Sequence, residues 1–368
     1  MRLNKFFNLL IFSLLLASCS EEAPDYRWMW QEAHHLDDSV MTARYGEPRE
    51  DMNNIFGAVL EAVEGNWDKV DALTRGSRTS ELYAYYHNLA MAMKGCLADS
   101  LMYYYQPFER GLFLPVGEKS GQMRIAASSE VWFRLGEMTM AEHSAMLAQI
   151  FSPHHFGVPY LKRLAEINMV NGQDEAARKY LHLLSGEPGC GDWVSDRIPG
   201  QESKAVKENI SALRALVPDR DIVHSPSDYR GMLKNLLASN PGNGLARQYL
   251  LCLDIITKDL VHFIEDYDPS RDRSRLYDEA VLIFLAQRGA LTPQNVSHFG
   301  IPQETLQEFS DYNDMVNFNR GAMEPMQKKY GKTYYNLTEE SLKEVFPDDG
   351  FYRNPNLEVQ EELYDVWV

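Results

Sequence analysis

Between residues 159 and 188 the sequence describes a complete helix–turn–helix unit, which constrains the fold more than any other feature. Pro159 suits the first turn of a helix, where a missing N–H costs nothing, and apolar residues follow at helical spacing. Gly172 ends this helix, because glycine accepts the left-handed backbone conformation. A second helix with acidic residues at its start runs on to Leu184. We expect a hairpin in which the small residues Ala165 and Ala177 let the two helices approach closely.

The same plan recurs along the chain. Leu135-Gly136 matches Leu164-Ala165 and Ala148 matches Ala177, both at an offset of 29 residues, and the spacing resembles a degenerate tetratricopeptide repeat. Further helical segments run from Met52 to Val63, Trp67 to Leu73, Leu82 to Met93, Ala246 to Leu253, Leu260 to Ile264 and Leu276 to Arg288. Each hairpin exposes an apolar face that a neighbouring hairpin can cover, so the sequence predicts an all-α, tetratricopeptide-like solenoid with very little strand.

The N-terminus predicts an export signal. A cationic start with Arg2 and Lys5 precedes an apolar run over residues 6–16, too short to cross a bilayer as a resident helix. The segment ends in Leu16-Ala17-Ser18-Cys19 and resembles the lipobox of a bacterial lipoprotein. We therefore expect residues 1–18 to be removed and Cys19 to be lipidated.

The remaining chain divides into three parts. Residues 19–48 form an acidic tether with one possible short helix, residues 49–346 the helical repeat domain, and residues 347–368 an acidic, aromatic tail. The lead-in Ser20-Glu21-Glu22 resembles the acidic export signal of surface-displayed lipoproteins of Bacteroidetes, with a solvated tether as the alternative. The expected location is the outer membrane, and display at the cell surface stays open.

Charge and cysteine content exclude several classes of function. The net charge of −17 argues against a nucleic-acid partner, which needs clustered Lys and Arg, and against adhesion to anionic lipid. Membrane contact should therefore come from the acyl chains on Cys19. The other three cysteines, Cys96, Cys190 and Cys252, leave one disulfide pair open.

Several ordered segments resemble an uncharacterised helical-repeat family of Bacteroidetes. The resemblance spans roughly residues 55–335 and rests on the stretches 88–99, 130–138, 161–181 and 240–250. Members of that family often carry membrane-spanning segments ahead of this region, where this chain has the lipobox. The resemblance implies no established activity, so it supplies no catalytic residues.

No motif in the sequence predicts chemistry. The dense histidine groups, His34-His35 and His154-His155, lack the spacing of a metal site, because adjacent side chains on a helix diverge. Cys190 lies in a glycine-rich turn beside Trp193 and is better explained as a structural cysteine than as a nucleophile. We expect no metal, no cofactor and no catalytic residue.

Aromatic residues are the remaining signal. Dense groups of tyrosines cannot all point inward, so some should reach a groove, where tyrosine serves binding well. The candidate binding residues are Tyr83, Tyr85, Tyr86, Tyr103, Tyr104 and Tyr105.

The predicted function is that of a membrane-anchored, non-enzymatic scaffold that binds a protein partner through its helical repeats. Two alternatives stay open, a glycan-binding accessory lipoprotein for nutrient uptake and an enzyme with an unrecognised carboxylate site. Glycan binding, turnover of a defined substrate, or co-purification of one stoichiometric protein would distinguish the three.

Overall fold

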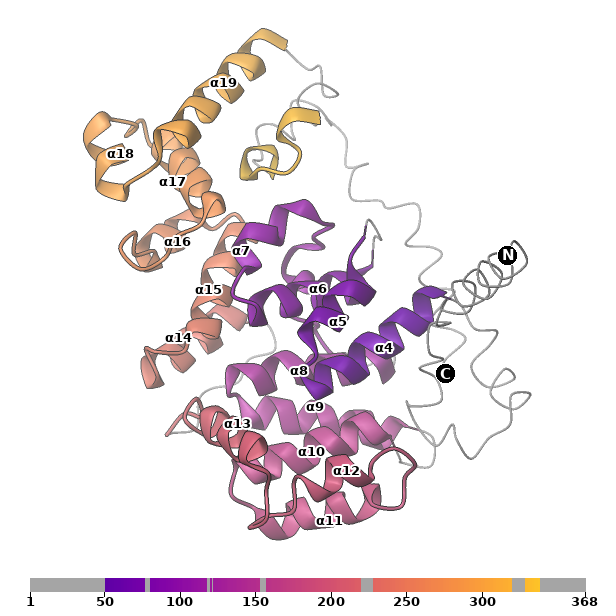
Figure 1. The fold of residues 1–368 in the computed structure, drawn as a ribbon. Helices are drawn as coiled ribbons and strands as arrows, with labels where there is room; N and C mark the ends of the chain where they lie inside the picture. Colours follow the sequence, from indigo (N-terminus) through magenta and orange to yellow (C-terminus); the bar gives the residue numbers. More distant parts are fainter. Residues whose placement is uncertain are drawn as a thin grey trace, which may run out of the picture.

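A computed structural model describes residues 50–76, 80–117, 120, 122–152, 157–219, 228–319 and 328–337, and these residues contain helices and no strand (Figure 1). The principal helices are α4 (Glu50–Glu64), α5 (Trp67–Thr74), α6 (Glu81–Met93), α7 (Leu97–Ser100), α8 (Gln122–Leu135), α9 (Met138–Phe151), α10 (Val158–Val170), α11 (Asp174–Leu184), α12 (Gly191–Ser195), α13 (Lys204–Arg214), α14 (Tyr229–Ser239), α15 (Gly244–Ile256), α16 (Leu260–Asp266), α17 (Arg275–Gln287), α18 (Pro293–Phe299) and α19 (Gln303–Asn319). Adjacent helices pack in pairs, which confirms the predicted all-α helical-repeat solenoid.

The expected signal peptide, Cys19, the tether and the tail lie outside the described residues, as do His34, His35, His154 and His155. None of the helices within the described ranges is long and apolar enough to span a membrane.

A shared two-residue turn builds the hairpins. Its first residue has a positive φ, and the N–H of its second residue donates to the carbonyl five positions back, as Gln173 does to Asn168 at 2.8 Å. The first positions of these turns, in the pairs α4–α5, α6–α7, α8–α9, α10–α11 and α15–α16, are Gly65, Gly95, Gly136, Gly172 and Lys258. Glycine adopts this conformation without the penalty that a Cβ brings, so it occupies four of these five positions. These turns lie between helices that the sequence predicted.

The predicted repeat offset of 29 residues is wrong. The equivalent turn glycines are Gly136 and Gly172, so the two hairpins are related by a shift of 36 residues. Gly136 therefore does not match Ala165, which lies in the middle of α10, and the counterpart of Ala177 is Ala141 rather than Ala148. The alanines Ala141, Ala165 and Ala177 are fully buried, as expected for positions where helices approach closely.

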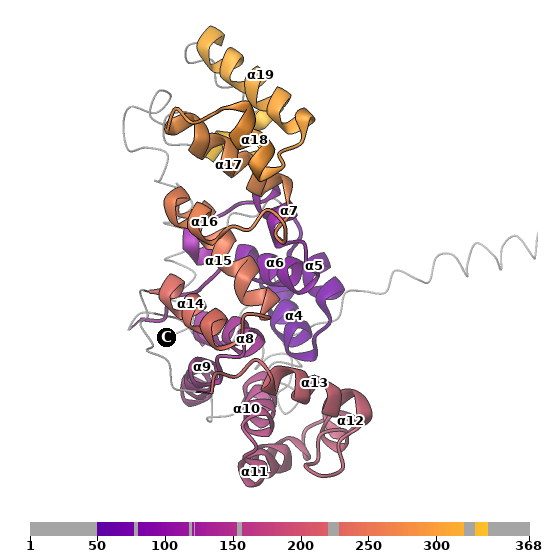
Figure 2. The ribbon, with the colours of Figure 1, turned by 90° about the vertical axis from the view of Figure 1, so that its left-hand side faces the viewer.

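The order of stacking departs from the order of the sequence. After α7 the order of packing reverses, so that α8 packs against α4 and α6. Hairpins α8–α9 and α10–α11 then extend one end of the molecule, and α15 returns along α6, α7 and α8 (Figure 2). Helix α17 packs on α7. The elongated body thus consists of two rows of helices in its middle part.

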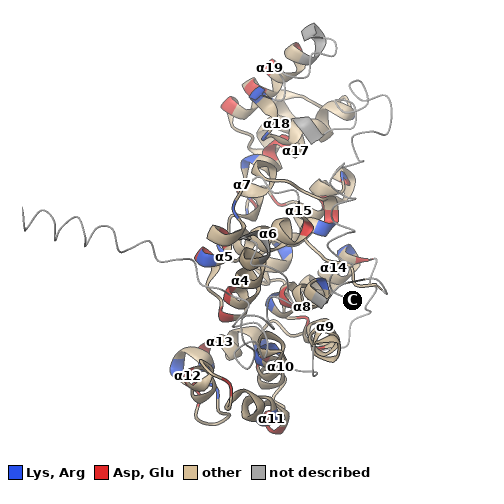
Figure 3. Ribbon diagram, turned by 90° about the vertical axis from the view of Figure 1, so that its right-hand side faces the viewer, with Lys and Arg blue, Asp and Glu red and all other residues tan. Residues whose placement is uncertain are grey.

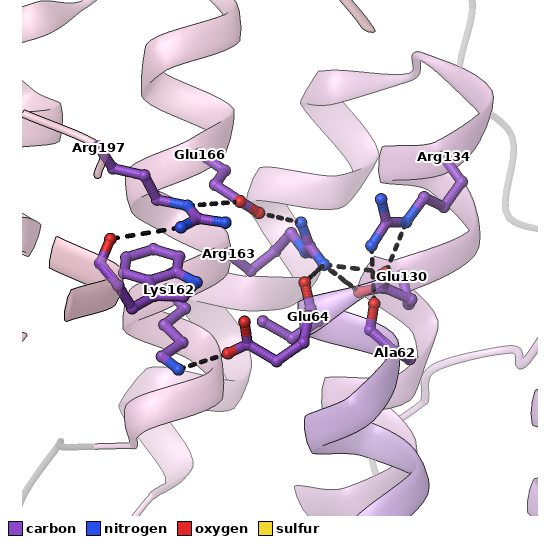
Figure 4. A network of polar contacts seen from close by, with 10 residues as sticks. Ala62, Glu64, Glu130, Arg134, Lys162, Arg163, Glu166 and Arg197 are labelled. Atoms are coloured by element: carbon purple, nitrogen blue, oxygen red, sulfur yellow. Dashed lines mark hydrogen bonds and ion pairs between the residues drawn. The ribbon is translucent and has the colours of Figure 1, made fainter. Parts of the chain in front are cut away.

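A buried arginine–glutamate network holds α8 and α10 together (Figure 4). Glu130 accepts from Arg134 at 2.9 Å and from Arg163 at 2.8 Å, and Arg163 also donates to Glu166 at 2.5 Å. Glu166 in turn accepts from Arg197, which follows α12, at 3.0 Å. The Arg163 side chain is only 2% exposed, so these partners replace its water entirely.

The network also reaches α4 and two aromatic rings. Arg134 donates to the carbonyl of Ala62, in the last turn of α4, at 2.7 Å, and this carbonyl also accepts from the N–H of Gly65. The guanidinium of Arg163 stacks on the ring of Phe133 at 3.8 Å, and that of Arg197 stacks on Trp193 at 3.9 Å. Every charge in this network thus has a partner, and we assign it a structural role.

Candidate functional site

Three of the predicted binding tyrosines belong to the core. Tyr83, Tyr85 and Tyr86 lie on α6, and all three side chains are buried. The Tyr85 hydroxyl donates to the carbonyl of Ala127 at 2.6 Å and accepts from the N–H of Val131 at 3.0 Å. Burial raises the pKa of Tyr85 and Tyr86 well above the usual value. These tyrosines fix α6 against α8 and present no binding surface.

The other three tyrosines lie together on a non-repetitive segment, residues 101–116, which we call the aromatic loop. Tyr103 is 55% exposed, Tyr105 is 37% exposed, and Phe108 beside them is 39% exposed. Tyr104 is half-buried, with its ring 4.0 Å from that of His87. Within the predicted set, therefore, only Tyr103 and Tyr105 offer an aromatic surface, and Phe108 adds to it.

Buried polar contacts hold the aromatic loop in place. The side-chain amide of Gln106 donates to the carbonyl of Leu101 at 2.8 Å and to the side chain of Asn88 at 3.2 Å. Asn88, fully buried on α6, donates in turn to the carbonyl of Gly111 at 2.8 Å. Near the end of the loop, the ring of Phe113 stacks on Trp132 and Tyr229 and meets the ring of Tyr249 edge-on. The exposed rings thus project from a fixed backbone.

Phe108 has an unusual backbone conformation for an exposed aromatic residue. Its φ of +50° lies in the left-handed region, which costs an L-residue with a side chain about 1–2 kcal/mol. Such strain persists only where the surrounding structure holds it, and it concentrates at ligand-binding sites. An exposed ring on a strained backbone, in the same segment as Tyr103 and Tyr105, favours a binding role for the loop.

Charged residues of both signs flank the aromatic loop. Glu81 pairs with Arg110 at 2.9 Å and with Arg124, while the Lys332 ammonium lies 5.0 Å from the centre of the Tyr103 ring. Along the described ribbon in Figure 3, Lys and Arg are interspersed with Asp and Glu and form no continuous basic stripe on that face. The surface therefore suits a partner with mixed polar groups rather than a polyanion.

A buried histidine supports Tyr104 from below. The Nδ1 atom of His87 lies 3.6 Å from a carboxylate oxygen of Asp71, and burial lowers the pKa of His87 despite that neighbour. Burial alone would raise the pKa of the Asp71 carboxyl, but hydrogen bonds from Arg75 and Lys94 outweigh burial and lower that pKa overall. His87 is therefore neutral near pH 7 and packs as an aromatic ring under the loop.

The cysteines carry no reactive arrangement in the described part of the chain. Cys190 is buried in a cluster with Trp193, as the structural interpretation predicted, and burial raises the pKa of its thiol. Cys252 is fully buried, Cys96 is half-buried, and none of the three is disulfide-bonded in the structure. Within the described ranges no three His, Cys, Asp or Glu residues gather as metal ligands.

A cavity of about 200 Å³ lies beside α7, where no motif in the sequence predicted a site. Its charged lining comes from Asp99, Arg247, Arg271, Asp272 and Arg273. The alternation of Arg271, Arg273 and Arg275 with Asp272 and Ser274 is visible in the sequence and was the available signal.

Asp278, behind Arg273, should destabilise the protein at neutral pH. It is nearly buried on α17, and burial raises its pKa from 3.8 to about 6, although Arg273 opposes the shift. Because the folded-state pKa lies above the unfolded value, stability falls as pH rises from about 4 to above 6. Asp278→Asn should therefore raise the free energy of unfolding at pH 7 by on the order of 1–2 kcal/mol.

Urea unfolding of both proteins between pH 4 and pH 7.5 measures this difference. The advantage of Asp278→Asn should shrink below pH 6 and be small near pH 4, where the folded-state carboxyl is protonated and the unfolded-state carboxyl is close to its own pKa of 3.8. Asp314→Asn, at an exposed position on α19, is the matched control and should change little. A constant difference at every pH would show that the carboxylate charge is not the cause.

One protein family matches the chain. A family of unknown function (DUF6057) matches residues 3–336, which include all but the last residue of the described structure and also the N-terminal apolar run. No curated protein and no solved structure matches the chain. The match confirms membership of a family of unknown function and is wider than the expected residues 55–335.

Proposed function

We propose that this chain, which belongs to the DUF6057 family, is a membrane-anchored lipoprotein that binds a protein partner through the aromatic loop and acts without catalysis. The observation that carries the proposal is the set of exposed rings, Tyr103, Tyr105 and Phe108, on a loop fixed by buried hydrogen bonds. Rigid aromatic side chains lose little conformational entropy on binding and dominate many protein interfaces. A tetratricopeptide-like hairpin stack would serve as the frame that presents them.

The anchor in this proposal is Cys19, placed in the outer membrane of a bacterium of the Bacteroidetes type. Two acyl chains hold a protein at a membrane stably, whereas the acidic body adds no electrostatic attraction to anionic lipid. The short apolar run ahead of Cys19 supports this arrangement.

Metabolic labelling with an alkyne fatty acid tests the anchor. The wild-type chain should incorporate the label and partition into the membrane fraction, and Cys19→Ala should do neither. Cys96→Ala, at a half-buried cysteine of the helical body, is the control and should label like the wild type. Equal labelling of Cys19→Ala and the wild type would contradict lipidation.

Affinity capture from native membranes, followed by titration with the purified partner, tests the aromatic loop. An aromatic anchor in a desolvated pocket contributes about 2 kcal/mol or more, so Tyr103→Ala and Phe108→Ala should each weaken the complex at least roughly tenfold. Both variants should keep the thermal midpoint of the wild type, because the rings are exposed. Phe151→Ala removes a 62% exposed ring on α9 and is the matched control. Unchanged affinity in both loop variants would overturn the proposal.

Glycan binding is the second candidate, since exposed aromatic rings also stack on sugars. Binding of the wild type to a glycan array, lost in Tyr103→Ala and retained in Phe151→Ala, would favour this candidate over a protein partner.

A further inference from the structure

We propose that the cavity beside α7 is a binding site for a small molecule that carries an oxyanion group, a carboxylate or a phosphate. The cavity has a volume of about 200 Å³ and lies where distant segments of the chain meet. Residues 95–99 form one wall, the start of α15 a second, and residues 271–277 a third. This site is separate from the aromatic loop and independent of the proposed scaffold function.

Three guanidinium groups line the cavity, and one of them is fixed in place. Arg247 makes a bidentate pair with Asp272, with Nε 2.8 Å from Oδ1, and it donates to the carbonyl of Asp266 at 2.9 Å. The N–H of Asp268 also donates to Asp272, so the carboxylate of Asp272 is fully engaged. Asp272 thus orients Arg247, and the positive charge of Arg247 offsets the Asp272 carboxylate, which would otherwise repel an anion.

The other two arginines retain free donors. Arg271 donates to the carbonyl of Pro241 at 3.1 Å and forms no ion pair with any described residue. Arg273 donates to the carbonyls of Phe299 and Gly300 at 3.2 and 3.3 Å, with Asp278 3.9 Å away. A guanidinium carries five N–H donors, so both arginines keep donors for a ligand. Paired N–H groups of this kind match carboxylate and phosphate oxygens.

Two helix N-termini add to the positive potential. Helices α15 and α17 are each 13 residues long, and both begin at the cavity. Gly244, Arg247 and Gln248 line it from the first turns of α15, and Ser274 and Tyr277 line it from the start of α17. Asn243 caps the N–H of Ala246 at the start of α15, and Ser274 caps that of Leu276 at the start of α17, so the contribution of these ends to anion binding is the positive end of each helix dipole. The lining carries three arginines and two aspartates, a net positive charge in a chain whose overall net charge is −17.

Asp99 limits the ligand to a small anion with a polar body. Its carboxylate accepts from the Ser274 hydroxyl at 2.8 Å, so it lies next to the segment that carries Arg271 and Arg273. A long polyanion would meet this carboxylate, whereas a molecule with one oxyanion and a hydroxyl or amino group would satisfy both walls. The cavity therefore favours a small metabolite over a nucleic acid.

Isothermal titration calorimetry of the full chain at pH 7 tests the proposal, with inorganic phosphate and succinate as probes and sodium chloride at equal ionic strength as the reference. At least one probe should bind saturably, and binding of one alone assigns the oxyanion. A hydrogen bond to a charged group contributes about 1.5–3 kcal/mol, so Arg271→Gln and Arg273→Gln should each weaken binding roughly tenfold or more. Arg288→Gln replaces an exposed arginine at the C-cap of α17, outside the cavity, and should bind as the wild type does.

Protection of arginines from phenylglyoxal gives a second readout that needs no variant. The bound probe should slow modification of Arg271 and Arg273 and leave Arg288 unchanged, as measured by peptide mass spectrometry. The proposal is overturned if neither probe binds more tightly than chloride, or if binding persists at full strength when both Arg271 and Arg273 are replaced.

Discussion

Replacing Arg163 by methionine should lower the free energy of unfolding by about 3–5 kcal/mol, the largest effect we expect of any single substitution. Methionine keeps an unbranched apolar side chain of the length of the arginine stem but removes the guanidinium that pairs with both Glu130 and Glu166 and stacks on Phe133. Both carboxylates are nearly inaccessible to water, so each would then keep a single arginine partner in a buried site. The cost comes from the charge-assisted hydrogen bonds that both buried carboxylates lose and from the weaker compensation of their charges.

Equilibrium unfolding in urea measures this effect, and Arg178→Met is the matched control. Arg178 is exposed and pairs with an exposed Glu175, so its replacement should cost less than about 1 kcal/mol. The double variant Glu130→Gln, Arg163→Met should cost less than the sum of the two single variants, because Arg163 and Glu130 pair with each other and each substitution removes the partner that the other one leaves behind. A loss below 1 kcal/mol for Arg163→Met would show that the network adds little to stability.

Gly136→Ala should cost about 2–5 kcal/mol, the sum of a conformational penalty and a steric one. Gly136 has a φ of +88°, which an alanine adopts only at a cost of about 1–2 kcal/mol. In addition, a Cβ there would lie 2.6 Å from the Cβ of Leu216 and 2.9 Å from its backbone carbonyl group. A backbone cannot give way as a flexible side chain can, so the end of α13 would have to move.

Gly172→Ala separates the two contributions. Gly172 occupies the equivalent turn with a φ of +72°, and a Cβ there would meet no atom within 4 Å. This variant should therefore cost only the conformational part, about 1–2 kcal/mol. Equal losses in the two variants, measured by thermal and urea unfolding, would contradict the steric contact with Leu216.

The hairpins could be predicted from the sequence because their signals are local. A glycine two residues before the next helix, together with apolar residues at helical spacing, defines α10–α11 completely within residues 158–184. The return of the chain between α7 and α8 could not be predicted, since it depends on contacts between distant residues. The offset of 29 is wrong for a different reason. It matches Gly136, which lies in a turn, with Ala165, which lies inside α10, and the two small residues look alike in the sequence.

The candidate site shows the same division. The density of tyrosines predicted an aromatic surface, but helical spacing could not show that Tyr103 and Tyr105 lie on a segment fixed by Asn88 and Gln106 rather than on an α-helix. The cavity was beyond prediction for a further reason. Its arginines are close in sequence, yet the wall that makes them a cavity, at Asp99, lies 175 residues away from Ser274.

The return of the chain also determines the order in which the molecule can assemble. Each hairpin closes over a turn of two residues and can form early, whereas Asn243 reaches the carbonyl of Leu135 across 108 residues. Contacts of such high contact order pay a larger loop-closure entropy and come late in folding. We therefore expect the docking of α15 and α17 onto α6 and α7 to come late, and the cavity forms only when these helices have docked. Any molecule held between its walls would slow the separation of the two rows of helices and leave the individual hairpins untouched.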